Sequence, residues 1–129
     1  MLTLRPLFAE FLGTAAIVTA VLGSGHMVQQ LEAGPALGLL MIALAVGAVL
    51  FGAISALGSI SGAQFNPAVS LVFLIKRELG LGSFFGFVLA QLLGALAGAA
   101  LANAMYGKTL LPVSSVERAG TGLWVGEVV

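Results

Sequence analysis

The sequence has no cysteine, one histidine and few charged residues, and each shortage excludes a class of protein. Without cysteine there is no disulfide and no thiolate metal site, and a metal centre built on His26 alone is not expected. Charged residues make up 8% of the 129 residues, against about 25% in soluble domains. The formal net charge is zero, which gives no basic footprint for nucleic acid. No nucleophile–base pair, metal-ligand spacing or phosphate-binding loop is evident, so we expect neither an enzyme nor a cofactor.

Apolar residues are abundant instead, at 60% of the chain. They form three blocks between the charges, at residues 7–28, 35–57 and 81–106. Each block is close to the roughly 20 residues that a membrane-spanning helix needs. The sequence therefore predicts an all-α, multi-pass integral membrane protein with three transmembrane helices, and we expect it in the plasma (inner) membrane.

The segment between the second and third blocks does not fit a simple loop. No charged residue occurs from Ala33 to Ile75, a length that would give about 65 Å of helix. The hydrocarbon core of a bilayer is about 30 Å thick, so one helix cannot use this length. A polar loop cannot face lipid either. We therefore predict that residues 58–76 re-enter the membrane and stop halfway.

Within this re-entrant segment, Asn66 and Pro67 have the properties of a helix start. Asparagine is a good N-cap, and proline fits the first helical position. A helix from Pro67 to Ile75 would be about 13 Å long, roughly half of the bilayer core. Lys76 and Arg77 would bring its C-terminal end back to water, and their charge complements the helix dipole there. The N-terminal end would lie near the membrane midplane.

Small residues recur every four positions in the third block and in a shorter stripe in the second. Such stripes let helix backbones approach each other closely, so we expect both to mark helix packing. They are Gly82, Gly86, Ala90, Gly94, Gly98 and Ala102, and Ala48, Gly52 and Ala56.

Three segments resemble the aquaporin (major intrinsic protein) family. Ser61–Val69 (SGAQFNPAV) looks like its first signature loop, Ala9–Thr14 (AEFLGT) like its first helix, and Ala90–Ala95 (AQLLGA) like its third. The matches occur in the family's order and spacing, and they cover the first half of a family member. The resemblance implies that residues 1–129 are one repeat of a fold with two inverted repeats.

The resemblance also implies roles for single residues. Asn66, Pro67 and Ala68 would be the pore motif at the tip of a half-helix, and Glu10 and Gln91 would support the loop. The tail, residues 108–129, would be the connection to a fourth span and its start, where Glu127 matches the position of Glu10.

Selectivity would depend on Val46, Gln64 and Val69, which the resemblance places along the pore. Water-selective members tend to carry a bulky aromatic residue where this chain has Val46, so we expect a wider and less polar constriction. The family often has histidine where this chain has Gln64, and its filter arginine follows a second motif. Val69 occupies the corresponding position after the one motif present. Backbone carbonyls of residues 58–65, if unwound, would add a line of hydrogen-bond acceptors.

The expected function is a passive channel for water or small neutral, glycerol-like solutes. A half-helix N-terminus carries about half a positive charge, and two meeting at the midplane would repel cations and protons. Because the chain has one such motif, we expect a truncated or split family member that pairs with a second repeat in the lipid bilayer. We also expect a homo-oligomer.

Two alternatives remain open from the residues alone. One is a half-channel that pairs antiparallel with itself, since the predicted inner cations (Arg5, Lys76 and Arg77) barely outnumber the outer ones (Lys108 and Arg118). The other is a non-conducting fragment, or a small dual-topology transporter or assembly subunit. An exporter would need an ionisable residue in mid-membrane, and Glu10 lies near the end of its predicted span.

Overall fold

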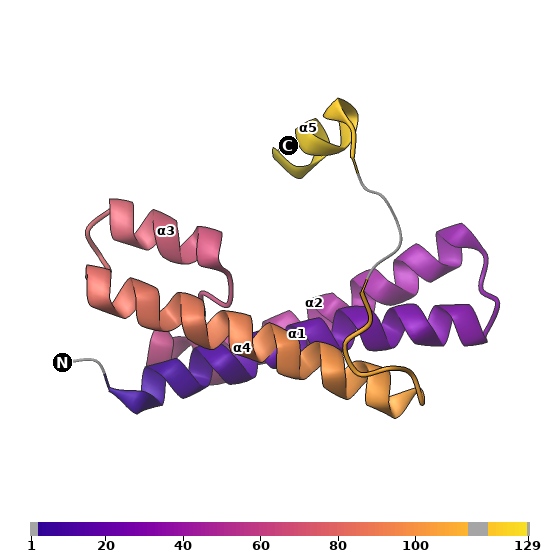
Figure 1. The fold of residues 1–129 in the computed structure, drawn as a ribbon, viewed down its shortest axis with the longest axis horizontal. Helices are drawn as coiled ribbons and strands as arrows, with labels where there is room; N and C mark the ends of the chain where they lie inside the picture. The colour runs from indigo at the N-terminus through magenta and orange to yellow at the C-terminus, as the bar shows by residue number, and fades with distance from the viewer. Residues whose placement is uncertain (1–2, 114–118, 129) are drawn as a thin grey trace.

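The computed structural model describes residues 3–113 and 119–128, so Arg118 lies outside the described residues. All regular structure in these ranges is helical, which confirms the predicted fold class (Figure 1). The helices are α1 (Leu4–Gln30), α2 (Pro35–Ser61), α3 (Pro67–Ile75), α4 (Leu81–Met105) and α5 (Thr121–Val128).

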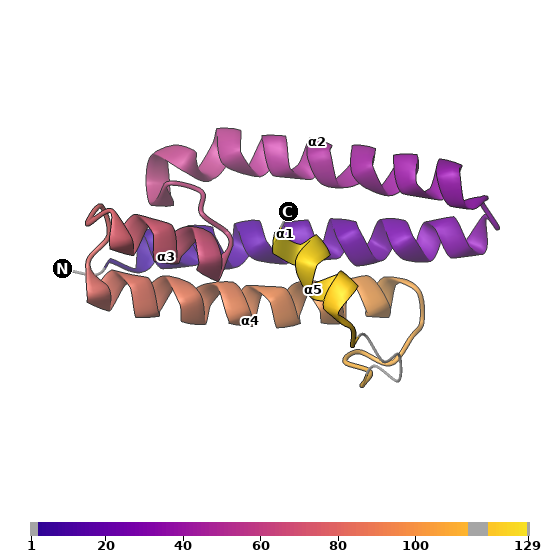
Figure 2. The same ribbon diagram turned by 90° about the horizontal axis from the view of Figure 1, so that it is seen from above.

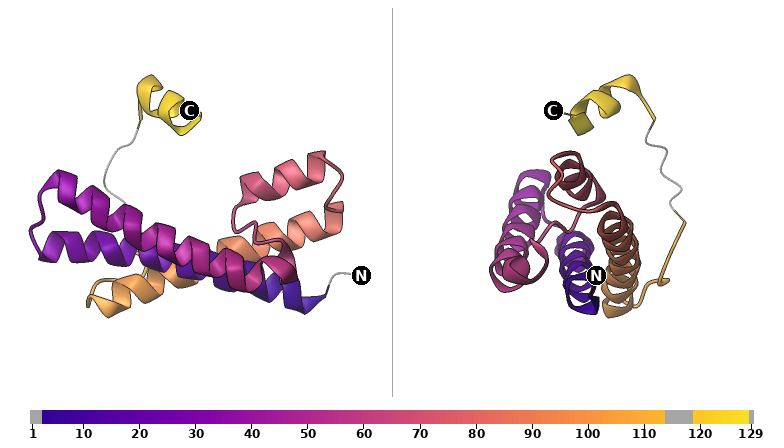
Figure 3. Two further views of the ribbon diagram at one scale, coloured as in Figure 1. Left: turned by 180° about the vertical axis from the view of Figure 1, so that it is seen from behind. Right: turned by 90° about the vertical axis from the view of Figure 1, so that its left-hand side faces the viewer.

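Helices α1, α2 and α4 are long and apolar enough to cross a membrane. They have 27, 27 and 25 residues, or about 40 Å each, which exceeds the roughly 30 Å of a hydrocarbon core. The three long helices alternate in direction along the chain, and α1 lies between α2 and α4 (Figures 2 and 3). The chain is therefore an integral membrane protein. Helix α5 stands apart from this bundle (Figure 1).

The long helices extend beyond the predicted apolar blocks. Helix α2 ends at Ser61 rather than at residue 57, so the first part of the predicted re-entrant loop is helical. Gly62 ends the helix with a left-handed backbone (φ +87°), and its N–H donates to the carbonyl of Gly58 at 3.0 Å. Glycine adopts this conformation at no steric cost. The unwound segment is thus residues 62–66, and the carbonyls of residues 58–61 belong to a helix.

The small-residue stripe of α4 packs against α1. Ala90, Gly94, Gly98 and Ala102 are buried, whereas Gly82 is exposed. A Cβ added to Gly94 or Gly98 would overlap the backbone of α1. The hydroxyl of Thr19 donates across the same interface to the carbonyl of Gly98, at 3.2 Å. Glycine is therefore needed at these two positions for α1 and α4 to approach.

The shorter stripe of α2 behaves differently from our expectation. Ala48, Gly52 and Ala56 are all exposed on the surface of the chain. Helix α2 contacts α1 through other residues, among them the buried Gly38, whose Cα lies against the side chain of Val28. The stripe is exposed because α2 packs against α1 with a different face.

A polar cluster joins the C-terminal ends of α1 and α4. The Nε2 of His26 lies 2.9 Å from the Oδ1 of Asn103, and the Nζ of Lys108 lies 2.9 Å from the Nδ1 of His26. The amide of Asn103 also donates to the carbonyl of Leu110, at 2.9 Å. His26 thus connects the end of the bundle to the segment that follows α4.

Helix α3 is the short element that positions the candidate site. It runs beside the first half of α4, and its N-terminal end lies inside the length of the bundle, short of its middle (Figure 2). Seen end-on, α3 lies over the bundle on the side opposite α1 (Figure 3). From the end of α2 the chain runs inward along the bundle at residues 62–66 and returns to the same end along α3 (Figure 2).

Candidate functional site

One face of α1 carries the residues that hold the loop at 62–66. Glu10, Gly13 and Thr14 follow the i, i+3, i+4 spacing that places side chains together on a helix. All three are buried, and Glu10 is fully buried. A buried carboxylate inside a membrane protein is costly unless it is hydrogen-bonded. The hydrogen-bond partners of Glu10 therefore decide whether its burial is tolerated.

The carboxylate of Glu10 accepts four hydrogen bonds. Its Oε1 accepts from the hydroxyl of Ser61 at 2.6 Å and from the backbone N–H of Gln64 at 3.0 Å. Its Oε2 accepts from the backbone N–H of Phe65 at 2.6 Å and from the side-chain amide of Gln91 at 2.8 Å. These bonds satisfy the buried carboxylate without a cation and join it to α2, the loop and α4.

Gln91 connects the loop to the half-helix. Its amide nitrogen donates both to Glu10 and to the hydroxyl of Ser70, at 2.9 Å. Gln91 and Ser70 are 1% and 0% exposed, so this connection lies in the interior between α3 and α4. The predicted loop-supporting residues, Glu10 and Gln91, thus lie in one hydrogen-bonded cluster.

The loop backbone adopts conformations that residues other than glycine rarely adopt. Ala63 and Phe65 have φ values of +51° and +49°, in the left-handed region. Each such residue costs about 1–2 kcal/mol. The bonds from the N–H groups to Glu10 offset this cost, as does the bond from the hydroxyl of Thr14 to the carbonyl of Phe65, at 3.3 Å. The loop is therefore held in a strained form by α1.

Asn66 starts α3 as the sequence predicts. Its backbone is extended, and its side-chain Oδ1 accepts from the N–H of Ala68 at 2.8 Å. This is the N-cap arrangement, and it leaves the amide N–H groups of the side chain directed elsewhere. Asn66, Pro67 and Ala68 are all exposed on the surface of the chain.

The other predicted lining residues are not brought together in the same way. Val69 is 39% exposed beside the Asn66 motif, whereas the side chain of Gln64 is only 7% exposed. The backbone N–H of Gln64 donates to Glu10, and Gln64 is buried within this chain. The Oε1 of Gln64 has no hydrogen-bond partner among the described residues. Val46 is half-buried on α2.

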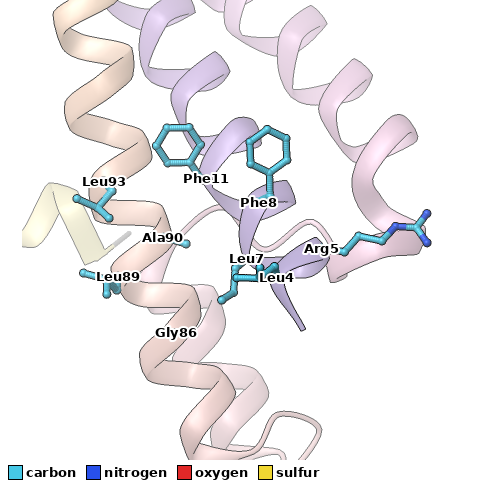
Figure 4. Close-up of a pocket in the computed structure, with 9 residues that line it drawn as sticks. All are labelled: Leu4, Arg5, Leu7, Phe8, Phe11, Gly86, Leu89, Ala90 and Leu93. Atoms are coloured by element: carbon cyan, nitrogen blue, oxygen red, sulfur yellow. The ribbon is translucent and has the colours of Figure 1, made fainter. Parts of the chain in front are cut away.

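An apolar groove of about 690 Å³ lies between the start of α1 and the middle of α4. Figure 4 shows Leu89 and Leu93 on one side of it and the side chain of Arg5 extending away from them. The groove has almost no polar lining, so it suits lipid tails rather than a polar solute.

Comparison with known proteins places the chain in a family. The family model described as "Major intrinsic protein" matches residues 1–127. The chain belongs to the major intrinsic protein family. It is 44% identical over 125 residues to "Aquaglyceroporin AqpS" of Rhizobium meliloti (strain 1021), an alignment that covers 97% of this chain and 54% of the relative.

Relatives from vertebrates have similar sequence identity to the chain, over shorter alignments. The chain is 45% identical over 105 residues to the lens fiber major intrinsic protein of Lithobates pipiens, covering 81% of this chain and 37% of the relative. For the human protein of that name the identity is 42% over 97 residues, covering 75% and 35%. The chain thus spans about half the length of the aquaglyceroporin, and less of the lens proteins.

Several residues of the cluster were not predicted as site residues from the sequence. These are Gly13, Thr14, Ser61 and Ser70. Helical spacing from Glu10 could have indicated Gly13 and Thr14, because both share its face. The hydrogen bonds of Ser61 and Ser70 depend on how the loop folds back against α1 and α4. No local sequence pattern indicates that arrangement.

Proposed function

We propose that this chain forms half of a passive membrane channel for water and small neutral solutes, with the start of α3 at the centre of the pore. The observation that carries the proposal is that α3 begins after its N-cap Asn66 inside the length of the bundle, not at its end, and leaves Asn66 exposed (Figure 2). An exposed polar backbone at this depth cannot face lipid tails. We therefore place it on a water-filled path.

The start of α3 provides the chemistry of such a path. The dipole of α3 gives a local positive charge at the start of the helix, which repels cations. The Oδ1 of Asn66 is occupied by the N–H of Ala68, so its amide N–H groups are free to donate to a passing oxygen. Exposed Val69 adds an apolar wall that offers a solute few partners. Passage needs no reaction, and the protein acts as a channel rather than an enzyme.

The proposed solute class includes glycerol-like molecules. Val46 takes the place of a bulky aromatic residue expected in water-selective members, which widens the constriction. One relative is named an aquaglyceroporin, which agrees with this class. The membrane in which the channel acts is proposed to be the plasma (inner) membrane.

A second repeat is needed to complete the pore. Beyond Asn66 and Val69, one face of α3 is apolar and exposed: Leu71, Val72 and Ile75. We propose that a second aquaporin-like repeat, either an antiparallel copy of this chain or a separate chain, covers this face in the bilayer, and that such units form homo-oligomers. A proton-coupled transporter is disfavoured, because the carboxylate of Glu10 is occupied by four donors.

Reconstitution of the chain into vesicles tests the proposal. For the antiparallel pair, stopped-flow light scattering is expected to show water and glycerol permeability above that of empty vesicles, with no proton flux. Swelling in water without glycerol entry would contradict the solute class. C-terminal reporter fusions separate the partners: insertion in both orientations supports the antiparallel pair, and a single orientation excludes it.

A further inference from the structure

Phe65, the residue before Asn66, is packed into a gap on α1 that exists because residue 13 is glycine. The ring of Phe65 is buried, with the residue 7% exposed. A Cβ built on Gly13 would overlap three ring atoms, Cδ1, Cε1 and Cζ. Gly23 and Gly25, on the same helix, have open space at the corresponding point. The close approach is therefore specific to the loop and is not a general property of α1.

Three neighbouring residues of α1 hold three different parts of Phe65. Glu10 accepts from its N–H, Gly13 receives its ring, and Thr14 donates to its carbonyl. The backbone of Phe65 is left-handed, at φ +49°, which an aromatic residue adopts only when its surroundings impose it. Because Asn66 follows directly, the position of Phe65 determines where α3 begins.

We propose that the ring of Phe65 and the gap at Gly13 form a knob and hole that position Asn66 at the proposed pore centre. Phe65 is then a positioning residue, which acts through its neighbour and does not touch the solute. The expected effect on permeability rests on the proposed function. The contact between Phe65 and Gly13 does not. It predicts that positions 13 and 65 tolerate substitution together better than separately.

A double-mutant cycle with Gly13→Ala and Phe65→Ala tests this coupling. The added methyl group at residue 13 conflicts with the ring, and removing the ring in the double variant makes room for that methyl group. Gly23→Ala is the matched control, because it is the same change on the same helix in open space. Thermal unfolding in detergent gives the stability of each variant.

A single cysteine reports the position of the loop. Since the chain has no cysteine, Ser70→Cys gives one thiol at a fully buried position of α3. Gly13→Ala is expected to raise its labelling rate by a maleimide about tenfold, because a displaced loop lifts α3 from α4. The double variant is expected to restore protection, and the Gly23→Ala control to leave it unchanged. Permeability, measured on the same proteins, should fall and recover in parallel.

The outcomes separate the knob and hole from channel function. Additive effects on unfolding, or a thiol that stays protected in Gly13→Ala, would overturn the inference even if the vesicles conduct. Coupled effects on unfolding and labelling would support it even if the wild-type chain shows no permeability, a result that would count against the proposed function alone.

Discussion

Replacing Glu10 by alanine is expected to release the loop at 62–66 and to abolish any permeability of the chain. The change removes the acceptor of four hydrogen bonds, two of them from backbone N–H groups for which Glu10 is the one acceptor among the described residues. Each buried donor left unsatisfied costs about 1–3 kcal/mol. We therefore expect a loss of at least about 3 kcal/mol in the free energy of unfolding, measured by thermal unfolding in detergent.

Glu32 offers a matched control for the carboxylate. It lies exposed in the turn between α1 and α2, so Glu32→Gln should change the free energy of unfolding by less than about 0.5 kcal/mol. Glu10→Gln should still be destabilising, because its amide would turn N–H donors toward groups that themselves donate. A Glu10→Ala variant as stable as the wild type would show that the four bonds do not hold the loop.

The second large effect is expected at Gly98. Its Cα lies against the backbone of Ala15, so the methyl group of Gly98→Ala must push two helix backbones apart. A helix backbone cannot rotate out of the way as a side chain can. Overpacking of this kind costs about 1–3 kcal/mol, and we expect the upper part of this range because the α1–α4 interface is extensive.

Gly82 is the control for this substitution, since it lies on the same helix with open space around it. Gly82→Ala should be neutral or slightly stabilising, by up to about 1 kcal/mol. Thermal unfolding of the two variants side by side measures the difference. Equal stability of Gly98→Ala and Gly82→Ala would mean that α1 and α4 do not approach as closely as described.

The sequence predicts the helices well because their signals are local. Long apolar runs indicate spans wherever they occur, and the pair Asn66 and Pro67 indicates a helix start by its own chemistry. The end of α2 was harder to predict, because the polar residues after residue 57 suggested a loop. Hydrogen bonds from Ser61 and the turn at Gly62 instead allow the helix to continue to the loop itself.

The site was only partly predictable, because its contacts join segments far apart in the chain. Glu10 was assigned a supporting role by family resemblance, but its four partners come from α2, the loop and α4. The burial of Gln64 follows from the same contacts. Likewise, the two small-residue stripes look alike in the sequence. Which of them is buried depends on which face of α2 and of α4 packs against α1.

The most direct test of the account is a thiol block at Val69, next to the exposed start of α3. A lone cysteine at this position, in a chain that otherwise has none, can be modified in reconstituted vesicles while stopped-flow permeability is followed. If solutes pass the start of α3, a methanethiosulfonate reagent is expected to reduce permeability to that of empty vesicles, and a reducing agent is expected to restore it. Leu39→Cys, exposed near the start of α2, should be modified without effect. Complete modification at residue 69 with unchanged permeability would contradict the claim that solutes pass the start of α3.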